Sequence, residues 1–144
     1  MGAVRSILVP VDGSAASLDA VSLACSIAKR HKGGKVYAVH VIEVRRSLPL
    51  DAELSEEASS GEDVLSAAER VAAEADFRIE GELLQAREAG HAIVDEATER
   101  SVDLILMGSE HKSRYGEYQI GRLAQYVLKA APCNVWLWRR PIQE

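Results

Sequence analysis

The sequence predicts an α/β protein built on an open parallel sheet of five strands, with helices on both of its faces. Two observations carry this prediction: five short apolar runs lie along the chain, and segments with helical spacing separate them. Parallel strands need a crossover connection, which a helix supplies. The length of 144 residues is typical of one domain, so we expect residues 1–144 to form a single domain.

The predicted strands differ in how completely they are covered. Four are nearly continuous apolar runs, as expected of strands with helices on both faces, whereas the third alternates apolar and polar residues like a half-exposed edge strand. In chain order the strands are expected at residues 7–11, 36–42, 78–84, 103–108 and 134–138.

Apolar residues at helical spacing predict four helices. The first is expected to end at Gly33, the second to begin after Gly61, and the last to stop at Pro132, which cannot continue a helix. Residues 43–61 have no steady period and predict a long loop, and residues 109–118 predict a polar one.

Composition excludes several classes of protein. There are 17 Lys and Arg against 22 Asp and Glu, which gives a formal net charge of −5 and argues against a nucleic-acid partner. Two distant cysteines do not form a secreted disulfide framework. No apolar run approaches the roughly 18 residues that span a bilayer, so we expect no membrane insertion and a cytoplasmic location.

Open parallel sheets bind ligands beyond the carboxyl ends of their strands. Asp12 follows the first strand, where its carboxylate can hold a ribose hydroxyl or a metal-bound water. The alternative is that Asp12 or Ser14 only caps the following helix.

Gly108 and Gly121 flank the loop after the fourth strand. Glycine at a helix N-terminus lets backbone N–H groups approach an anion closely. The alternative is that Gly108 only makes the turn out of the strand and Gly121 only relieves helix packing. Nearby, Lys112, Arg114 and Arg122 can pair with phosphate oxygens or simply face water.

Catalytic and metal-binding patterns are missing from the sequence. The four histidines lack metal-ligand spacing, and His40 is expected to be a hydrogen-bonded core residue. The stretch GSEHKSRYG lacks the ending of a P-loop, and no nucleophile elbow or paired carboxylates are visible. We therefore expect no catalytic residue and no resident metal.

Three segments together resemble the universal stress protein family: ILVPVDGSAASLDA, VDLILMGSE and GRLAQYVLKAAPCNVWLW. The resemblance covers nearly the whole chain except residues 45–60. It implies a Rossmann-like fold of the adenine nucleotide alpha hydrolase type with strand order 3-2-1-4-5. It also implies a homodimer formed through the last strand, which carries Val135, Trp136, Leu137 and Trp138.

Nucleotide-binding members of this family carry the loop Gly-x2-Gly-x9-Gly-[Ser/Thr], whose backbone holds phosphates. Its outer glycines match Gly108 and Gly121, but the middle glycine is replaced by His111 and the final hydroxyl residue by Arg122. Glu110 stands where the family often places an arginine. Near a polyphosphate it would repel the ligand unless Mg²⁺ lay between them.

The adenosine end of the family's site is better matched. The resemblance implies a nucleotide site formed by Pro10, Val11, Asp12, Ser14, Val41, Met107, Gly108, Glu110, His111, Gly121, Arg122, Leu123 and Ala124. The ligand implied is an adenine nucleotide (ATP, AMP or cyclic AMP), with Mg²⁺ only if a polyphosphate binds.

Three hypotheses for function follow. The first is a regulatory protein that binds an adenine nucleotide and acts through its dimer with little or no catalysis. The second is a dimeric interaction protein of the same fold that binds no nucleotide, in which Trp136 and Trp138 cover the joint or a nearby surface. The third is a weak ATPase that uses Asp12 and a metal.

Overall fold

A computed structural model describes residues 3–110, 113–114, 117–118 and 121–140 of the chain. The main strands are β1 (Ser6–Pro10), β2 (Lys35–Glu43), β3 (Glu80–Ala86), β4 (Leu104–Ser109) and β7 (Asn134–Arg139). The helices are α1 (Ala15–Ala28), α2 (Ser55–Glu74), α3 (Ala89–Arg100) and α4 (Arg122–Ala130). None of the helices in this described part of the chain has the length and apolar character needed to cross a bilayer.

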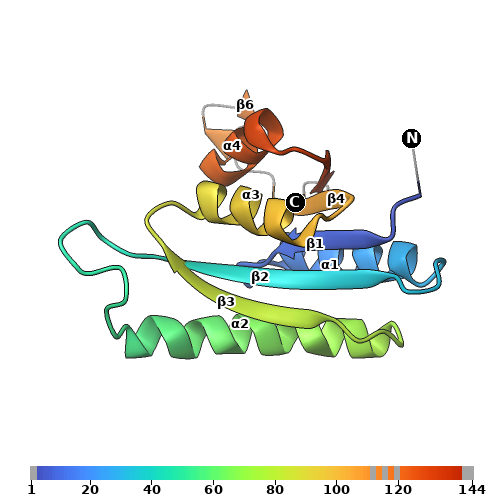
Figure 1. Cartoon of the computed structure of the whole chain (residues 1–144), viewed down its shortest axis with the longest axis horizontal. Coiled ribbons are helices and arrows are strands. Elements are labelled where there is room, and N and C mark those ends of the chain that lie inside the picture. The colour runs from blue at the N-terminus through green and yellow to red at the C-terminus, as the bar shows by residue number, and fades with distance from the viewer. Residues whose placement is uncertain (1–2, 111–112, 115–116, 119–120, 141–144) are drawn as a thin grey trace.

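The five main strands form one parallel sheet in the order β3-β2-β1-β4-β7 (Figure 1). This confirms the predicted fold class and the strand order 3-2-1-4-5. The chain adds strands outward on one side of β1 and then on the other, so the order reverses between β1 and β4. That reversal point is where open α/β sheets bind their ligands.

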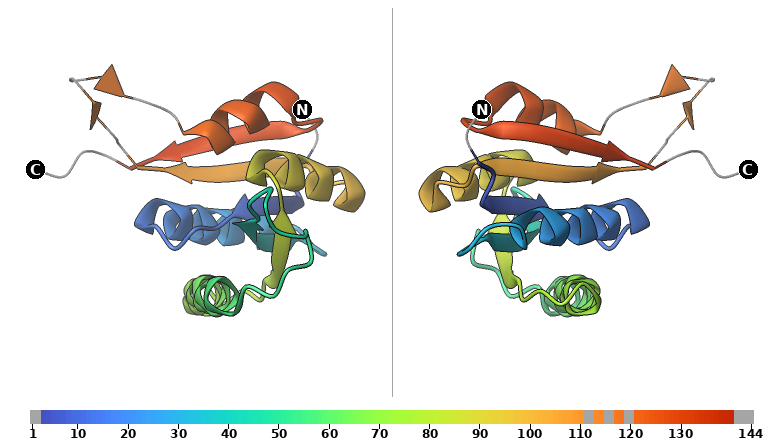
Figure 2. Two further views of the ribbon diagram at one scale, coloured as in Figure 1. Left: turned by 90° about the vertical axis from the view of Figure 1, so that its left-hand side faces the viewer. Right: turned by 90° about the vertical axis from the view of Figure 1, so that its right-hand side faces the viewer.

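Two helices cover each face of the sheet (Figures 1 and 2). On one face, Ile7 and Val9 of β1 pack with Val21 of α1 and Leu65 of α2. On the other, Leu8 of β1 joins the core beneath α3 and α4. Alternate residues of β1 thus enter opposite cores, which is why its sequence is apolar without interruption.

The central pair of strands, β1 and β4, is held together at its amino end. One carboxylate oxygen of Asp103 accepts hydrogen bonds from the backbone N–H groups of Arg5 and Ser6 at 2.9 and 3.0 Å, and from the Ser6 hydroxyl at 3.2 Å. In the described residues of the two strands, the β1–β4 ladder pairs Ile7 with Leu104 and then ends with Leu8 opposite Ile105. Toward their carboxyl ends β1 and β4 are therefore not paired with each other, although β1 stays paired with β2 and β4 with β7.

The structure corrects the expected loop over residues 43–61, because α2 already begins at Ser55. Its buried residues repeat every three or four positions from Gly61 onward, whereas its first turn is polar and carries Glu56 and Glu57. Acidic side chains favour a helix N-terminus through the helix dipole. The polar stretch before Gly61 is thus the exposed start of a long helix.

Other details of the elements also differ from expectation. The first helix ends at Ala28 rather than at Gly33, and the third strand lies two residues later than predicted. The polar loop after β4 contains a two-stranded antiparallel sheet of β5 (Ser113–Arg114) and β6 (Glu117–Tyr118).

The edge strand β7 is tied to α1 by Asp19. The Asp19 carboxylate accepts hydrogen bonds from Arg140 Nε at 2.7 Å and from Trp138 Nε1 at 3.3 Å. Trp136 and Trp138 remain 37% and 41% exposed. The rest of the described chain therefore covers both tryptophans only in part, and their exposed area lies beside the edge of the sheet.

Candidate functional site

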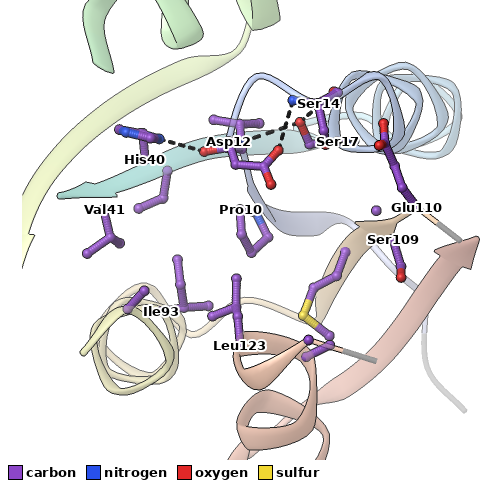
Figure 3. Close-up of a pocket in the computed structure, with 17 residues that line it drawn as sticks. Pro10, Asp12, Ser14, Ser17, His40, Val41, Ile93, Ser109, Glu110 and Leu123 are labelled. Carbon is purple, nitrogen blue, oxygen red and sulfur yellow. Dashed lines mark hydrogen bonds between the residues drawn. The ribbon is translucent and has the colours of Figure 1, made fainter. Parts of the chain in front are cut away.

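A cavity of about 260 Å³ opens where β1 and β4 part (Figure 3). The carboxyl ends of three strands and the first turns of three helices surround it. Its walls are formed by Pro10, Val11, Asp12, Ser14, Ser17, Val39, His40, Val41, Ala89, Ile93, Met107, Gly108, Ser109, Glu110, Gly121, Leu123 and Ala124. The volume is close to the lower end of the range for small-molecule sites, about 300–1,000 Å³.

The structure brings most of the predicted site residues together around this one cavity. Those that line it are Pro10, Val11, Asp12, Ser14, Val41, Met107, Gly108, Glu110, Gly121, Leu123 and Ala124. Arg122 is exposed at the first position of α4 and is not part of the walls. His111 and Lys112 lie outside the described residues, as does the side chain of Arg114.

The turn between β1 and α1 holds Asp12 at the mouth of the cavity. Asp12 Oδ1 accepts a hydrogen bond from the backbone N–H of Ser14 at 2.9 Å, and Ser14 Oγ accepts one from the N–H of Ser17 at 3.1 Å. Ser14 is thus the N-cap of α1, as one alternative anticipated. Gly13, between Asp12 and Ser14, has a φ of +86°, a conformation that suits glycine.

Asp12 combines this structural role with a free carboxylate oxygen. In Figure 3 one oxygen faces Ser14 and the other points into the cavity. Burial alone would raise the pKa of the Asp12 carboxyl, but hydrogen bonds from Ser14 and Ser17 outweigh it and hold that pKa below its ordinary value. The carboxylate is therefore ionised at neutral pH and can accept a hydrogen bond from a ligand hydroxyl.

His40 is the clearest wall residue that sequence reasoning did not assign to the site. Its Nδ1 lies 2.7 Å from the carbonyl oxygen of Val11, so Nδ1 must carry the donated hydrogen. This confirms the expected hydrogen-bonded histidine and adds that its ring forms part of the cavity wall. The sequence signal that could have assigned His40 to the site is its position directly before Val41 in the same strand.

Other wall residues come from α3 and from neighbours of predicted positions. Ile93 and Ala89 reach the cavity because α3 packs over β1, β2 and β4, a tertiary arrangement that helical spacing alone does not reveal. Val39 lies two residues before Val41 on β2, on the same face of that strand.

Gly108 has a packing role that neither sequence alternative anticipated. It lies within β4, where a Cβ would stand 2.1 Å from the carbonyl oxygen of Ala16 and 2.6 Å from the backbone nitrogen of Ser17. Only glycine lets the first turn of α1 lie this close to the strand.

Gly121 differs from Gly108 in its surroundings. It is the N-cap of α4, its φ is −65°, and a Cβ there would have no described atom within 4 Å. Helix packing therefore does not require this glycine. Gly121 has no side chain that could cap α4, and within the described residues the first N–H groups of this helix are therefore available at the edge of the cavity.

A resident metal is not supported by these residues. Within the described part of the chain, no three His, Cys, Asp or Glu side chains converge as a metal site requires. Asp12, His40 and Glu110 all line the cavity, but the three side chains do not come together as such a group.

Comparison with known proteins finds one family over almost the whole chain. The model of the universal stress protein family matches residues 3–139. A universal stress protein of Methanocaldococcus jannaschii is 34% identical over 146 aligned positions, which cover 97% of this chain and 85% of the relative.

Several solved structures of universal stress proteins have this fold. A universal stress protein of Lactobacillus plantarum has a TM-score of 0.74 and 29% identity, covering 96% of this chain and 100% of its own. The Archaeoglobus fulgidus protein in complex with dAMP gives 0.73 and 23%, covering 94% and 98%. A universal stress protein in complex with cAMP gives 0.73 and 20%, covering 96% and 98%.

Proposed function

The chain belongs to the universal stress protein family, and we propose that it binds an adenine nucleotide in the cavity between β1 and β4. The observation that carries this proposal is the ionised Asp12 carboxylate, which points one oxygen into a largely apolar cavity at the reversal point of the sheet. A ribose presents hydroxyl donors to such a carboxylate, and a purine base fills apolar space.

The walls divide into regions that suit the parts of a nucleoside. Val41, Ile93 and Leu123 form an apolar end next to Pro10 (Figure 3). Asp12 lies across the cavity from Leu123, on the turn that leads into α1 (Figure 3). We place the base at the apolar end and the ribose at Asp12. A 5′ substituent then extends toward Gly121 and the uncapped N–H groups of α4. Solved structures of family members in complex with dAMP and with cAMP support an adenine nucleotide as the class of ligand.

The first test is direct. Protein purified and then denatured is examined by mass spectrometry for released nucleotide, and the native protein is titrated with AMP, cyclic AMP and ATP by calorimetry. No heat with any of them at millimolar concentration would refute the proposal.

Asp12→Asn sharpens this test because the amide oxygen keeps the acceptor for the Ser14 N–H. The second carboxylate oxygen is replaced by a donor, so the hydrogen bond to the ribose is lost. Hydrogen bonds to charged groups contribute about 1.5–3 kcal/mol, which corresponds to at least tenfold weaker binding. Asp95→Asn, on the exposed side of α3 and outside the cavity, is the matched control.

The proposed role is binding rather than turnover, in a single domain acting in the cytoplasm. The free cysteines Cys25 and Cys133 are in keeping with that compartment. A weak ATPase would instead release ADP from Mg²⁺-ATP, and this release would disappear in Asp12→Ala. Turnover above the buffer background that depends on Asp12 would contradict a purely binding role.

A homodimer through β7 completes the proposal. β7 is an edge strand of the main sheet, and edge strands present unpaired backbone groups to other chains. Its exposed Trp136 and Trp138 add apolar area beside that edge. The same observation supports the second hypothesis, an interaction protein that dimerises and binds no nucleotide.

Val135 and Leu137 are poor probes of this dimer, because they pack against the core beneath α3 and α4. Trp136→Glu places a charge at the exposed edge instead and should yield monomers by light scattering. Leu128→Glu, on the exposed face of α4, is the control. A wild-type monomer at micromolar concentration would refute the dimer.

A further inference from the structure

Two carboxylates share the walls of the cavity. Asp12 follows β1, and Glu110 follows the end of β4 at Ser109. In Figure 3 the Glu110 side chain extends from β4 in the direction of α1, whereas Ser109 points the other way. The carboxylate of Glu110 therefore stands on the side of the cavity where the β1–α1 turn holds Asp12.

No described lysine or arginine offsets these charges within the cavity walls. Arg122 is exposed at the start of α4. Glu110 forms no ion pair with any residue that the structure describes. Among the described residues, the N-terminus of α4 offers an attraction for an anion, and a helix dipole typically changes affinity by about two- to fivefold.

We infer that Glu110 is a specificity-determining residue that selects adenine ligands carrying at most one negative charge, adenosine or cyclic AMP, over AMP, ADP and ATP. The inference rests on the proposed function, because it assumes that the adenine nucleoside occupies this cavity. Each further phosphate charge meets two carboxylates, and the N-terminus of α4, equivalent to about half a positive charge, offsets only part of the first phosphate charge.

The wild-type protein tests this directly by calorimetry with adenosine, cyclic AMP, AMP and ATP in EDTA. We expect ATP to bind at least about tenfold more weakly than adenosine. Salt screens repulsion between charges. Raising NaCl from 50 to 500 mM should therefore reduce the difference in affinity between adenosine and ATP, while the affinity for adenosine stays nearly constant. Added Mg²⁺ should also reduce this difference, because the cation neutralises part of the phosphate charge.

Variants at Glu110 separate charge from shape. Glu110→Gln keeps the side-chain size and should lower the adenosine-to-ATP affinity ratio by about three- to tenfold. Glu110→Arg should lower it further. Glu74→Gln, at the exposed far end of α2, removes the same charge outside the cavity and should leave the ratio unchanged.

The possible failures are distinguishable. ATP binding more tightly than adenosine in EDTA, or an affinity ratio unchanged in Glu110→Gln, would overturn this inference and leave the proposed function intact. If none of the four ligands binds, the proposed function fails and this inference fails with it.

Discussion

Replacing Gly108 by alanine tests the close approach of α1 to β4. The added Cβ would stand 2.1 Å from the Ala16 carbonyl oxygen, and ordinary contact begins near 3.4 Å. The helix and the strand would therefore have to separate by about 1.3 Å (3.4 − 2.1). Neither atom of this collision can rotate away as a side chain does, because the Cβ is attached directly to the backbone and the Ala16 oxygen is part of it.

The cost of this separation follows from the packing on that face. Residues of β4, α1 and α2 share one core, whose members Leu106 and Val21 are almost fully buried. Overpacking a core costs about 1–3 kcal/mol, and a collision between backbone atoms belongs at the upper end. We expect Gly108→Ala to lower the free energy of unfolding by about 3 kcal/mol, measured by urea denaturation monitored by circular dichroism.

Gly121→Ala is the matched control, since it makes the same change in the same motif where no described atom lies within 4 Å of the new Cβ. We expect a loss below about 1 kcal/mol there, the typical cost of a poorer N-cap residue. Neutral surface substitutions change the free energy of unfolding by up to roughly 0.5 kcal/mol. If the free energy of unfolding of Gly108→Ala lies within that range of the wild-type value, the packing argument is refuted.

Three further predictions concern stability and reactivity. Gly61→Ala should cost less than Gly108→Ala, about 1–2 kcal/mol, because the new Cβ meets the flexible Leu83 side chain at 2.6 Å rather than backbone; urea denaturation would contradict this if the order were reversed. Hydrogen bonds from the N–H groups of Arg5 and Ser6 lower the pKa of Asp103. The contribution of the Asp103 carboxylate to the free energy of unfolding is therefore complete above the pKa of about 3.9 that the group has in the unfolded chain, and it is lost as the pH falls through the pKa in the folded protein. The stability difference between wild type and Asp103→Asn should accordingly shrink below about pH 4, and a constant difference would contradict that role. Burial raises the pKa of Cys25 to about 11, so its thiol should stay unreactive toward Ellman's reagent at pH 8 until the protein unfolds. Because Cys133 is partly exposed, rapid labelling of both thiols in the native protein is the result that would show Cys25 to be accessible.

Much of the fold was predictable because β1, β2 and β4 are buried on both faces and are therefore apolar throughout. The start of α2 was not, because Leu54 provides no side-chain cap and the first buried position of the helix is Gly61. Helix periodicity becomes visible only where one face is buried, and the exposed turns before Gly61 carry no such signal.

The candidate site divides in a similar way. Asp12 and Val41 lie at strand ends, and the topology of an open sheet brings such ends together, so their neighbourhood followed from the sequence. The packing of α3 that brings Ile93 to the wall does not follow from any local pattern. Nor does the contact of Gly108 with Ala16, which joins two segments far apart in the chain.

The short ladder between β1 and β4 has a consequence for how this protein can change. Asp103 fastens the two strands at their amino ends, and the described pairing stops at Leu8 and Ile105, so the cavity exists without any ladder hydrogen bond being broken. Wall side chains such as Glu110 lie where the two central strands no longer pair with each other, although each strand keeps its ladder to its outer neighbour. Single substitutions at these positions can therefore change ligand preference while the ladders of the sheet preserve the architecture.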